Sequence, residues 1–134
     1  MTGDATANLA TARAYLKALE EGRPQDAQAY FAPGILQIEH PNRLKPNGER
    51  RTAEAMAADG HKGLTTLRGQ TYEIQNALAD GERVALEVLW TGVLDIPLGE
   101  LKPGDAMTCH SGIFLDFKDG KITGQRNFDC FPPF

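Results

Sequence analysis

The sequence predicts an α+β domain in which helices pack on one face of a curved antiparallel sheet. In the first half of the chain apolar residues recur at helical spacing, whereas from about residue 70 they alternate with a period of two. The alternating segments follow one another through short turns, as in antiparallel hairpins. A chain of 134 residues has the usual length of one domain, which we expect to span residues 1–134.

Three helices are expected before the alternation begins. In residues 6–21 leucine and alanine recur on one helical face, and Gly22 follows as a C-terminal cap. A short helix is expected over residues 24–31, because Pro24 fits a first helical turn. Thr52 is suited to N-cap a third, alanine-rich helix that ends near residues 60–63.

A short strand is expected over residues 35–40, where Pro41 ends it. Its alternation places His40 with two apolar residues on the face toward the helices, and Glu39 on the opposite face. Residues 42–50 contain proline and an Asn-Gly pair, and we expect them to form a loop.

Four longer strands are expected after the third helix. They cover residues 70–79, 83–94, 106–117 and 121–130. In the second of these, Trp90 shares the helix-facing side with Val88. In the third, Cys109, Ser111 and Ile113 share that side.

The register of the last strand depends on the turn around Asp119-Gly120. A two-residue type I′ turn brings Arg126 and Phe128 to the inner face, whereas a three-residue loop with a bulge at Gly120 brings Gln125, Asn127 and Asp129 there. We favour the second register, which places Asn127 opposite Ser111. Polar residues on an inward face need a reason, and a ligand pocket supplies one.

The composition argues against several classes of partner and cofactor. With 14 basic and 18 acidic residues the net charge is −4, which gives no general attraction to nucleic acid or to an anionic membrane. No apolar run is long enough to span a bilayer and no signal-peptide pattern is present, so we expect a cytoplasmic protein. The two cysteines form no disulfide framework, and neither metal-ligand spacing nor a glycine-rich phosphate loop occurs. We therefore expect no metal and no cofactor.

Several strings, in their order, resemble the SnoaL-like proteins of the nuclear transport factor 2-like superfamily over essentially the whole chain. They are AYLKALEEG, AYFAPGI, IEHPNRL, DGERVALEVLWTG and FLDFKDGKITGQRNFDCF. The resemblance implies a cone, in which N-terminal helices pack on the concave face of a strongly bent antiparallel sheet. It also implies a pocket at the open end and a homodimer formed through the sheet. The superfamily includes ketosteroid isomerases, limonene epoxide hydrolases and polyketide cyclases, so the fold alone does not define the function.

The resemblance also marks positions for chemistry. Tyr15 lies where ketosteroid isomerases place a tyrosine that stabilises an oxyanion, and His40 lies where they place the catalytic aspartate. Ile113 replaces their second oxyanion acid, which argues against that exact reaction. Gln125 and Asn127 match pocket positions, and Asn127 stands where the epoxide hydrolases have an aspartate that helps to activate water.

Asp129 is the nearest remaining carboxylate on the favoured inner face, where desolvation would raise its pKa. We therefore expect Tyr15, His40 and Asp129 to be catalytic. The expected ligand-binding residues are Trp90, Ser111, Ile113, Gln125 and Asn127. We expect Tyr15, His40, Asn127 and Asp129 to line one cavity of roughly 300 Å³ or more.

The expected function is cofactor-free proton transfer on a small apolar organic molecule, as in an isomerase, a cyclase or a hydratase. The alternative is a non-catalytic module that binds a lipid-like metabolite in the same cavity. Glu87 and His110 are expected on the convex face, where the sheets of a homodimer would meet.

Overall fold

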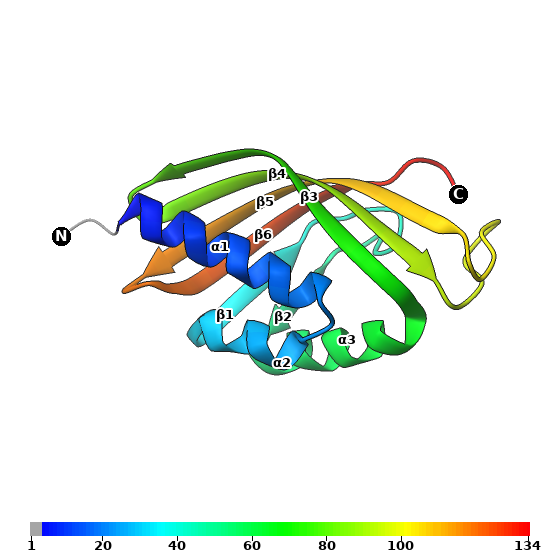
Figure 1. Ribbon diagram of the computed structural model, residues 1–134, viewed down its shortest axis with the longest axis horizontal. Helices are drawn as coiled ribbons and strands as arrows, with labels where there is room; N and C mark the ends of the chain where they lie inside the picture. The colour runs from blue at the N-terminus through cyan, green and yellow to red at the C-terminus, as the bar shows by residue number, and fades with distance from the viewer. Residues whose placement is uncertain (1–3) are drawn as a thin grey trace.

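The computed structural model describes residues 4–134, which form three α-helices, one 3₁₀ turn and a six-stranded sheet (Figure 1). The helical elements are α1 (Ala5–Glu20), α2 (Pro24–Ala27), η1 (Gln28–Tyr30) and α3 (Ala53–Thr66). The strands are β1 (Phe31–Glu39), β2 (Glu49–Thr52), β3 (Leu67–Asp80), β4 (Arg83–Leu94), β5 (Ala106–Lys118) and β6 (Lys121–Cys130). None of these helices is long and apolar enough to cross a membrane.

The helix caps follow from the local sequence. The Asp4 carboxylate accepts hydrogen bonds from two backbone amides in the first turn of α1, and the Thr52 hydroxyl accepts one from the amide of Ala55 in α3. Gly22, just past α1, has φ +73°, a left-handed conformation that glycine adopts without a steric penalty. The three expected helices are therefore confirmed, although α2 is shorter than expected and η1 follows it.

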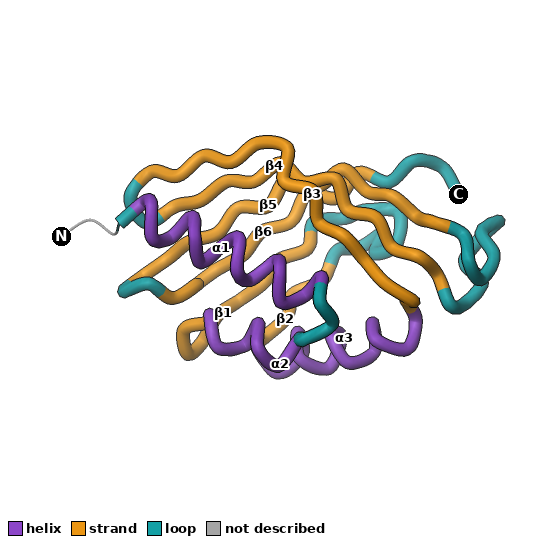
Figure 2. The backbone as a smooth tube through the Cα atoms, viewed as in Figure 1, coloured by secondary structure: helices purple, strands orange, loops and turns teal. Residues whose placement is uncertain are grey.

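The sheet has the strand order β2-β1-β6-β5-β4-β3, and it curves around α1 (Figure 2). All neighbouring strands are antiparallel except β1 and β6, which are parallel. The core lies between α1 and the concave face of the sheet, where Tyr15 and Leu16 meet Val88 and Leu115. This arrangement confirms the expected α+β cone.

The edge strand β2 differs from the expectation, which placed Glu49 and Arg50 in a loop and Thr52 at a helix N-cap. Its sequence is Glu-Arg-Arg-Thr, which has no apolar alternation, so its pairing with β1 leaves no hydrophobic signal. The strand β1 also begins at Phe31, earlier than expected, and bends near Gly34, where φ is +78°.

The faces of β1 are the reverse of those expected. Ile35 and Gln37 are buried on the concave side, whereas Leu36 is 37% exposed on the convex side. Glu39 therefore faces inward and His40 outward, so the expected pocket position of His40 is wrong. We had assumed that the apolar residues of this strand face the helices, but the inner face carries polar residues that Arg51 satisfies.

The last hairpin combines features of both registers considered. Asp119 and Gly120 form a two-residue turn with φ values of +52° and +77°, and Lys118 pairs with Lys121. One extra residue, Thr123, then bulges out of β6, so that Gln125 pairs with Leu115. The bulge turns Gln125, Asn127 and Asp129 inward as expected, although each pairs with a residue two positions away from the one we expected.

Candidate functional site

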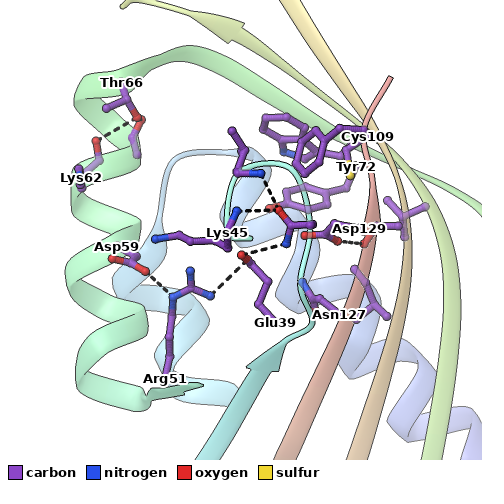
Figure 3. A pocket seen from close by; sticks show the side chains of 18 residues that line it. Glu39, Lys45, Arg51, Asp59, Lys62, Thr66, Tyr72, Cys109, Asn127 and Asp129 are labelled. Atoms are coloured by element: carbon purple, nitrogen blue, oxygen red, sulfur yellow. Dashed lines mark hydrogen bonds and ion pairs between the residues drawn. The ribbon is translucent and has the colours of Figure 1, made fainter. Parts of the chain in front are cut away.

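A cavity of about 440 Å³, which we call the first cavity, lies between α3 and the concave face of the sheet (Figure 3). Side chains of β1, β5 and β6 form one wall, and Asp59, Lys62 and Thr66 of α3 form the opposite wall. The walls also include Val88, Trp90, Ile113 and Phe131. The lining therefore combines apolar side chains with many polar and charged ones that converge on the cavity.

Two carboxylates from neighbouring strands reach the first cavity. Glu39 of β1 lies beside Asn127 in the parallel pairing of β1 with β6, and Asp129 follows two residues later on the same face. The Ser111 hydroxyl of β5 donates a hydrogen bond to Asp129 Oδ1. Asn42 Nδ2 donates to Glu39 Oε2 at 3.2 Å. The site therefore offers two acidic groups, Asp129 held by a hydroxyl and Glu39 by an amide and by the Arg51 guanidinium.

Burial raises the pKa of the Asp129 carboxyl above its ordinary value of 3.8. The hydrogen bond from Ser111 lowers this pKa, the negative charge of Glu39 raises it, and the positive charge of Arg51 lowers it. Desolvation is the largest of these effects, so the net direction is upward. A carboxyl whose pKa is raised in this way is suited to exchanging a proton with a bound molecule.

Arg51 of β2 organises the acidic groups around the first cavity. Its guanidinium lies 2.5 Å from Asp59 Oδ2 and from Glu49 Oε2, and 3.4 Å from Glu39 Oε1. It also donates to Gln37 Oε1 at 3.0 Å. The Arg51 side chain is only 10% exposed. The neighbouring carboxylates offset the free-energy cost of removing its charge from water.

A chain of hydrogen bonds connects the core to the cavity wall. The Tyr15 hydroxyl donates to Gln125 Oε1 at 2.7 Å, and Gln125 Nε2 donates to Asn127 Oδ1 at 2.8 Å. The Asn127 oxygen is thereby occupied, which leaves its Nδ2 group to donate toward the cavity. Burial raises the pKa of Tyr15 well above its usual range, so the phenol stays neutral and acts as a donor.

Three further side chains shape the cavity. Within residues 4–134 no hydrogen bond to the Tyr72 hydroxyl is formed, and burial raises the pKa of this phenol as well. Trp90 Nε1 donates to Gln70 Oε1 at 2.9 Å, which fixes the indole against the wall. Burial raises the pKa of the Cys109 thiol to about 12, so this cysteine is not a thiolate nucleophile at neutral pH.

The structure brings together some of the expected site residues and separates others. The first cavity is lined by Trp90, Ser111, Ile113, Asn127 and Asp129. Gln125 lies behind the wall and reaches the cavity through Asn127. His40 stacks on Phe128 of the convex face, with ring centroids 4.4 Å apart. The expectation that His40 lines the cavity is therefore wrong.

Tyr15 is also separated from the first cavity. It lines a second cavity of about 270 Å³, which lies beside the first. The expectation of one cavity lined by all four residues is wrong for Tyr15 as well as for His40.

The sequence reasoning missed Tyr72 and Arg51, and it placed Glu39 on the wrong face. Tyr72 lies in an alternating strand, and counting its phase from Ile74 would have placed it inward. For Arg51 no pattern was available, because its partners come from three separate segments.

A model of the SnoaL-like domain matches residues 12–125 of the chain. The chain belongs to the SnoaL-like domain family. This membership and the fold confirm the resemblance to SnoaL-like proteins inferred from the sequence. No curated protein sequence matches the chain.

Solved structures share the SnoaL-like fold at low sequence identity. AclR from Streptomyces galilaeus, a candidate hydroxylase, is 18% identical with a TM-score of 0.81, covering 97% of this chain and 83% of its own. IdmH from Streptomyces antibioticus, a candidate polyketide cyclase, is 17% identical with a TM-score of 0.76, covering 91% of each chain. A protein of Catenulispora acidiphila with a ketosteroid isomerase-like fold, solved with trimethylamine, is 15% identical with a TM-score of 0.72. That match covers 88% of this chain and 83% of the other.

Proposed function

We propose that this SnoaL-like protein is an enzyme that transfers protons on a small, mostly apolar carbonyl compound without a cofactor. Asp129 carries the proposal, because it is a partly desolvated carboxyl in the wall of a cavity large enough for such a molecule. Candidate cyclases and a ketosteroid isomerase-like fold among its structural relatives are consistent with this chemistry.

The proposed step uses groups already placed around the first cavity. The Asp129 carboxylate removes a proton from a carbon next to the substrate carbonyl. The electron pair of the broken C–H bond forms a carbon–carbon double bond, and the π electrons of the carbonyl move to its oxygen. The Nδ2 group of Asn127 and the hydroxyl of Tyr72 donate hydrogen bonds to the resulting oxyanion. In a substrate with a further double bond conjugated to the enolate, protonated Asp129 returns the proton to the far carbon as the carbonyl forms again, which completes an isomerisation. In a cyclase the enolate carbon attacks a second carbonyl carbon, and protonated Asp129 gives its proton to the alkoxide that forms.

Glu39 has a supporting role in this proposal. Its negative charge raises the pKa of Asp129 and so makes Asp129 a stronger base once it is ionised. The Arg51 guanidinium, 3.4 Å away, keeps Glu39 compatible with its partly buried position. His40 was first expected to take part in catalysis. In this proposal Asp129 transfers the proton and Glu39 supports it.

The protein is also proposed to form a homodimer through the convex face of the sheet. Phe114 and Phe128 are 42% and 45% exposed there and pack edge to face with centroids 5.7 Å apart, and Leu36 is exposed on the same face. Adjacent exposed aromatic side chains are typical of protein contacts. Glu87 and His110 also lie on exposed positions of this face, where they bind Asn76 and Gln75.

Exchange of α-protons tests the catalytic proposal without knowledge of the natural substrate. In D₂O the protein should accelerate the exchange of hydrogen for deuterium at the carbons next to the carbonyl of 2-heptanone. Proton NMR measures the rate of this exchange. Asp129→Asn should reduce the enzyme-dependent rate by about 100-fold or more, the usual contribution of general base catalysis.

The control for this experiment is Asp116→Asn, which removes a carboxylate paired with Arg126 outside both cavities. This variant should keep the rate of the wild-type protein. If 2-heptanone binds to the first cavity but no exchange occurs, the protein is a binding module rather than an enzyme.

A further inference from the structure

The two cavities are separated by a partition of four residues. Arg51, Asp59, Gly63 and Tyr72 line both the first and the second cavity. Arg51 Nε and Asp59 Oδ2 lie 2.5 Å apart, so an ion pair between β2 and α3 crosses this partition. The second cavity therefore lies directly behind the proposed site.

The partition has unfilled space beside Gly63. This glycine has no side chain, and a Cβ atom placed there would meet no atom within 4 Å. No residue of α3 is buried, so the helix rests on the sheet without contributing a fully buried side chain to the core. No side chain of residues 4–134 therefore fills the space beside Gly63, where the two cavities are adjacent.

The second cavity has apolar side chains on part of its wall, beside polar ones. Its walls include Leu19, Ala27, Phe31, Met56 and Leu67. This composition suits an apolar part of a ligand.

Two polar side chains of the second cavity, those of Tyr15 and Gln70, already have partners. The Tyr15 hydroxyl donates to Gln125. Gln70 accepts from Trp90 and donates to the carbonyl of Leu19. An apolar group entering this cavity would therefore leave neither Tyr15 nor Gln70 without a hydrogen-bond partner.

We propose that the two cavities form one continuous site for an elongated, mostly apolar molecule with an oxygen function at one end. The oxygen function lies in the first cavity beside Asp129 and Asn127, and the apolar body passes Gly63 into the second cavity. This inference rests on the proposed function, because it assumes that the carbonyl group is bound at Asp129. The cavities hold about 440 and 270 Å³, so a molecule that uses both is longer than the first cavity alone accommodates.

A series of methyl ketones from 2-pentanone to 2-tridecanone tests the length of the site by calorimetric titration. Each methylene that becomes buried should increase affinity about fourfold. In the wild-type protein this gain should continue after the tail has passed the partition. In Gly63→Leu, which places a side chain in the partition, and in Met56→Trp, which fills the second cavity, the gain should stop at a shorter ketone.

Ala58→Leu is the matched control, because it adds the same side chain to an exposed position of α3 that lines neither cavity. It should follow the wild-type series. Replacing a helical glycine by leucine favours the helix, so Gly63→Leu is expected to fold. Circular dichroism of each variant checks this.

The outcomes separate this inference from the proposed function. If the affinity gain stops at the same ketone in the wild-type protein and in Gly63→Leu, the continuous site is overturned while the first cavity stands. If 2-pentanone binds but longer ketones bind no better, the same conclusion holds. If no ketone binds to the wild-type protein, both the proposed function and this inference are contradicted.

Discussion

Asp129 combines a functional opportunity with a cost in stability. Its pKa is raised above 3.8 in the folded protein, so the folded state binds its proton more tightly than the unfolded state does. The contribution of this group to stability is therefore greatest at low pH and decreases as pH rises through the raised pKa. Each unit of such a shift corresponds to about 1.4 kcal/mol.

The substitution Asp129→Asn should consequently stabilise the protein at pH 7 while it removes proton transfer. Asparagine keeps an oxygen that can accept from Ser111 but carries no charge to desolvate. Thermal unfolding at several pH values measures the effect. The difference from the wild-type protein should shrink as pH falls toward 3.8 and below. A variant that is less stable at pH 7 would contradict the assigned direction of the pKa.

Two tyrosines near the site should respond differently to loss of the hydroxyl. Tyr15→Phe leaves the buried Gln125 oxygen without its donor, which should cost about 1–3 kcal/mol in chemical denaturation. Tyr72→Phe removes a hydroxyl that has no hydrogen bond within residues 4–134, so its stability should change by less than about 0.5 kcal/mol.

The affinity for 2-heptanone should depend more on the hydroxyl of Tyr72 than on that of Tyr15, the reverse of the order expected for stability. Tyr72→Phe should weaken 2-heptanone binding directly, because its hydroxyl is proposed to donate to the ligand oxygen. Equal losses of stability in the two variants would show that the Tyr72 hydroxyl has a structural partner.

At the residue scale the sequence identified five of the side chains that line the first cavity, but it exchanged Glu39 and His40. The alternation in β1 was visible, yet its phase was assigned from the apolar residues alone. Those residues, Leu36 and Ile38, belong to the convex face. Long-range partners decide this phase, because Arg51 from another strand satisfies Gln37 and Glu39.

At the scale of elements, the hairpin of β5 and β6 positions the site. Its two-residue turn alone would direct Arg126 inward, and the bulged Thr123 restores Gln125, Asn127 and Asp129 to the cavity. The sequence predicted the correct faces but placed the bulge at Gly120 rather than at Thr123. The reason is that a residue left out of a ladder has no signature in the alternation around it.

The turn can be tested through its glycine. Gly120 has φ +77°, where a side chain is strained, so Gly120→Ala should cost about 1–2 kcal/mol in unfolding free energy. The control is Gly69→Ala, where a Cβ atom meets nothing within 4 Å and φ is not positive. That change should stay within about 0.5 kcal/mol of the wild-type protein. Equal effects would show that the turn does not require the left-handed conformation.

At the scale of the whole molecule, the order of helices and strands predicted helices on one face of a curved antiparallel sheet, and the resemblance to SnoaL-like proteins implied the cone. Helices that precede sequential hairpins pack on one face of the sheet, and α1 does so. The sequence did not predict the division of the interior into two cavities. That division depends on α3, on the short strand β2 and on the ion pair between Arg51 and Asp59.

The proposed dimer is a property of the convex face as a whole. Phe128→Glu should reduce the mass in solution from twice 14.6 kDa to a single chain, because it places a charge within the exposed aromatic pair. Light scattering after size-exclusion chromatography measures this. Leu64→Glu, at a position 49% exposed on α3 and therefore away from the convex face, is the control and should remain dimeric. A wild-type protein with the mass of one chain would contradict the dimer.

The proposed function depends on Asp129 being a desolvated carboxyl that a ligand in the first cavity can reach. Carbon-13 NMR titration of the Asp129 carboxyl, with and without 2-heptanone, measures this. We expect a pKa above 3.8, a lower pKa in Glu39→Gln because a neighbouring negative charge is removed, and a change in the titration when the ketone is added. A carboxyl that titrates at or below 3.8 and does not respond to the ketone would show that Asp129 is not such a group.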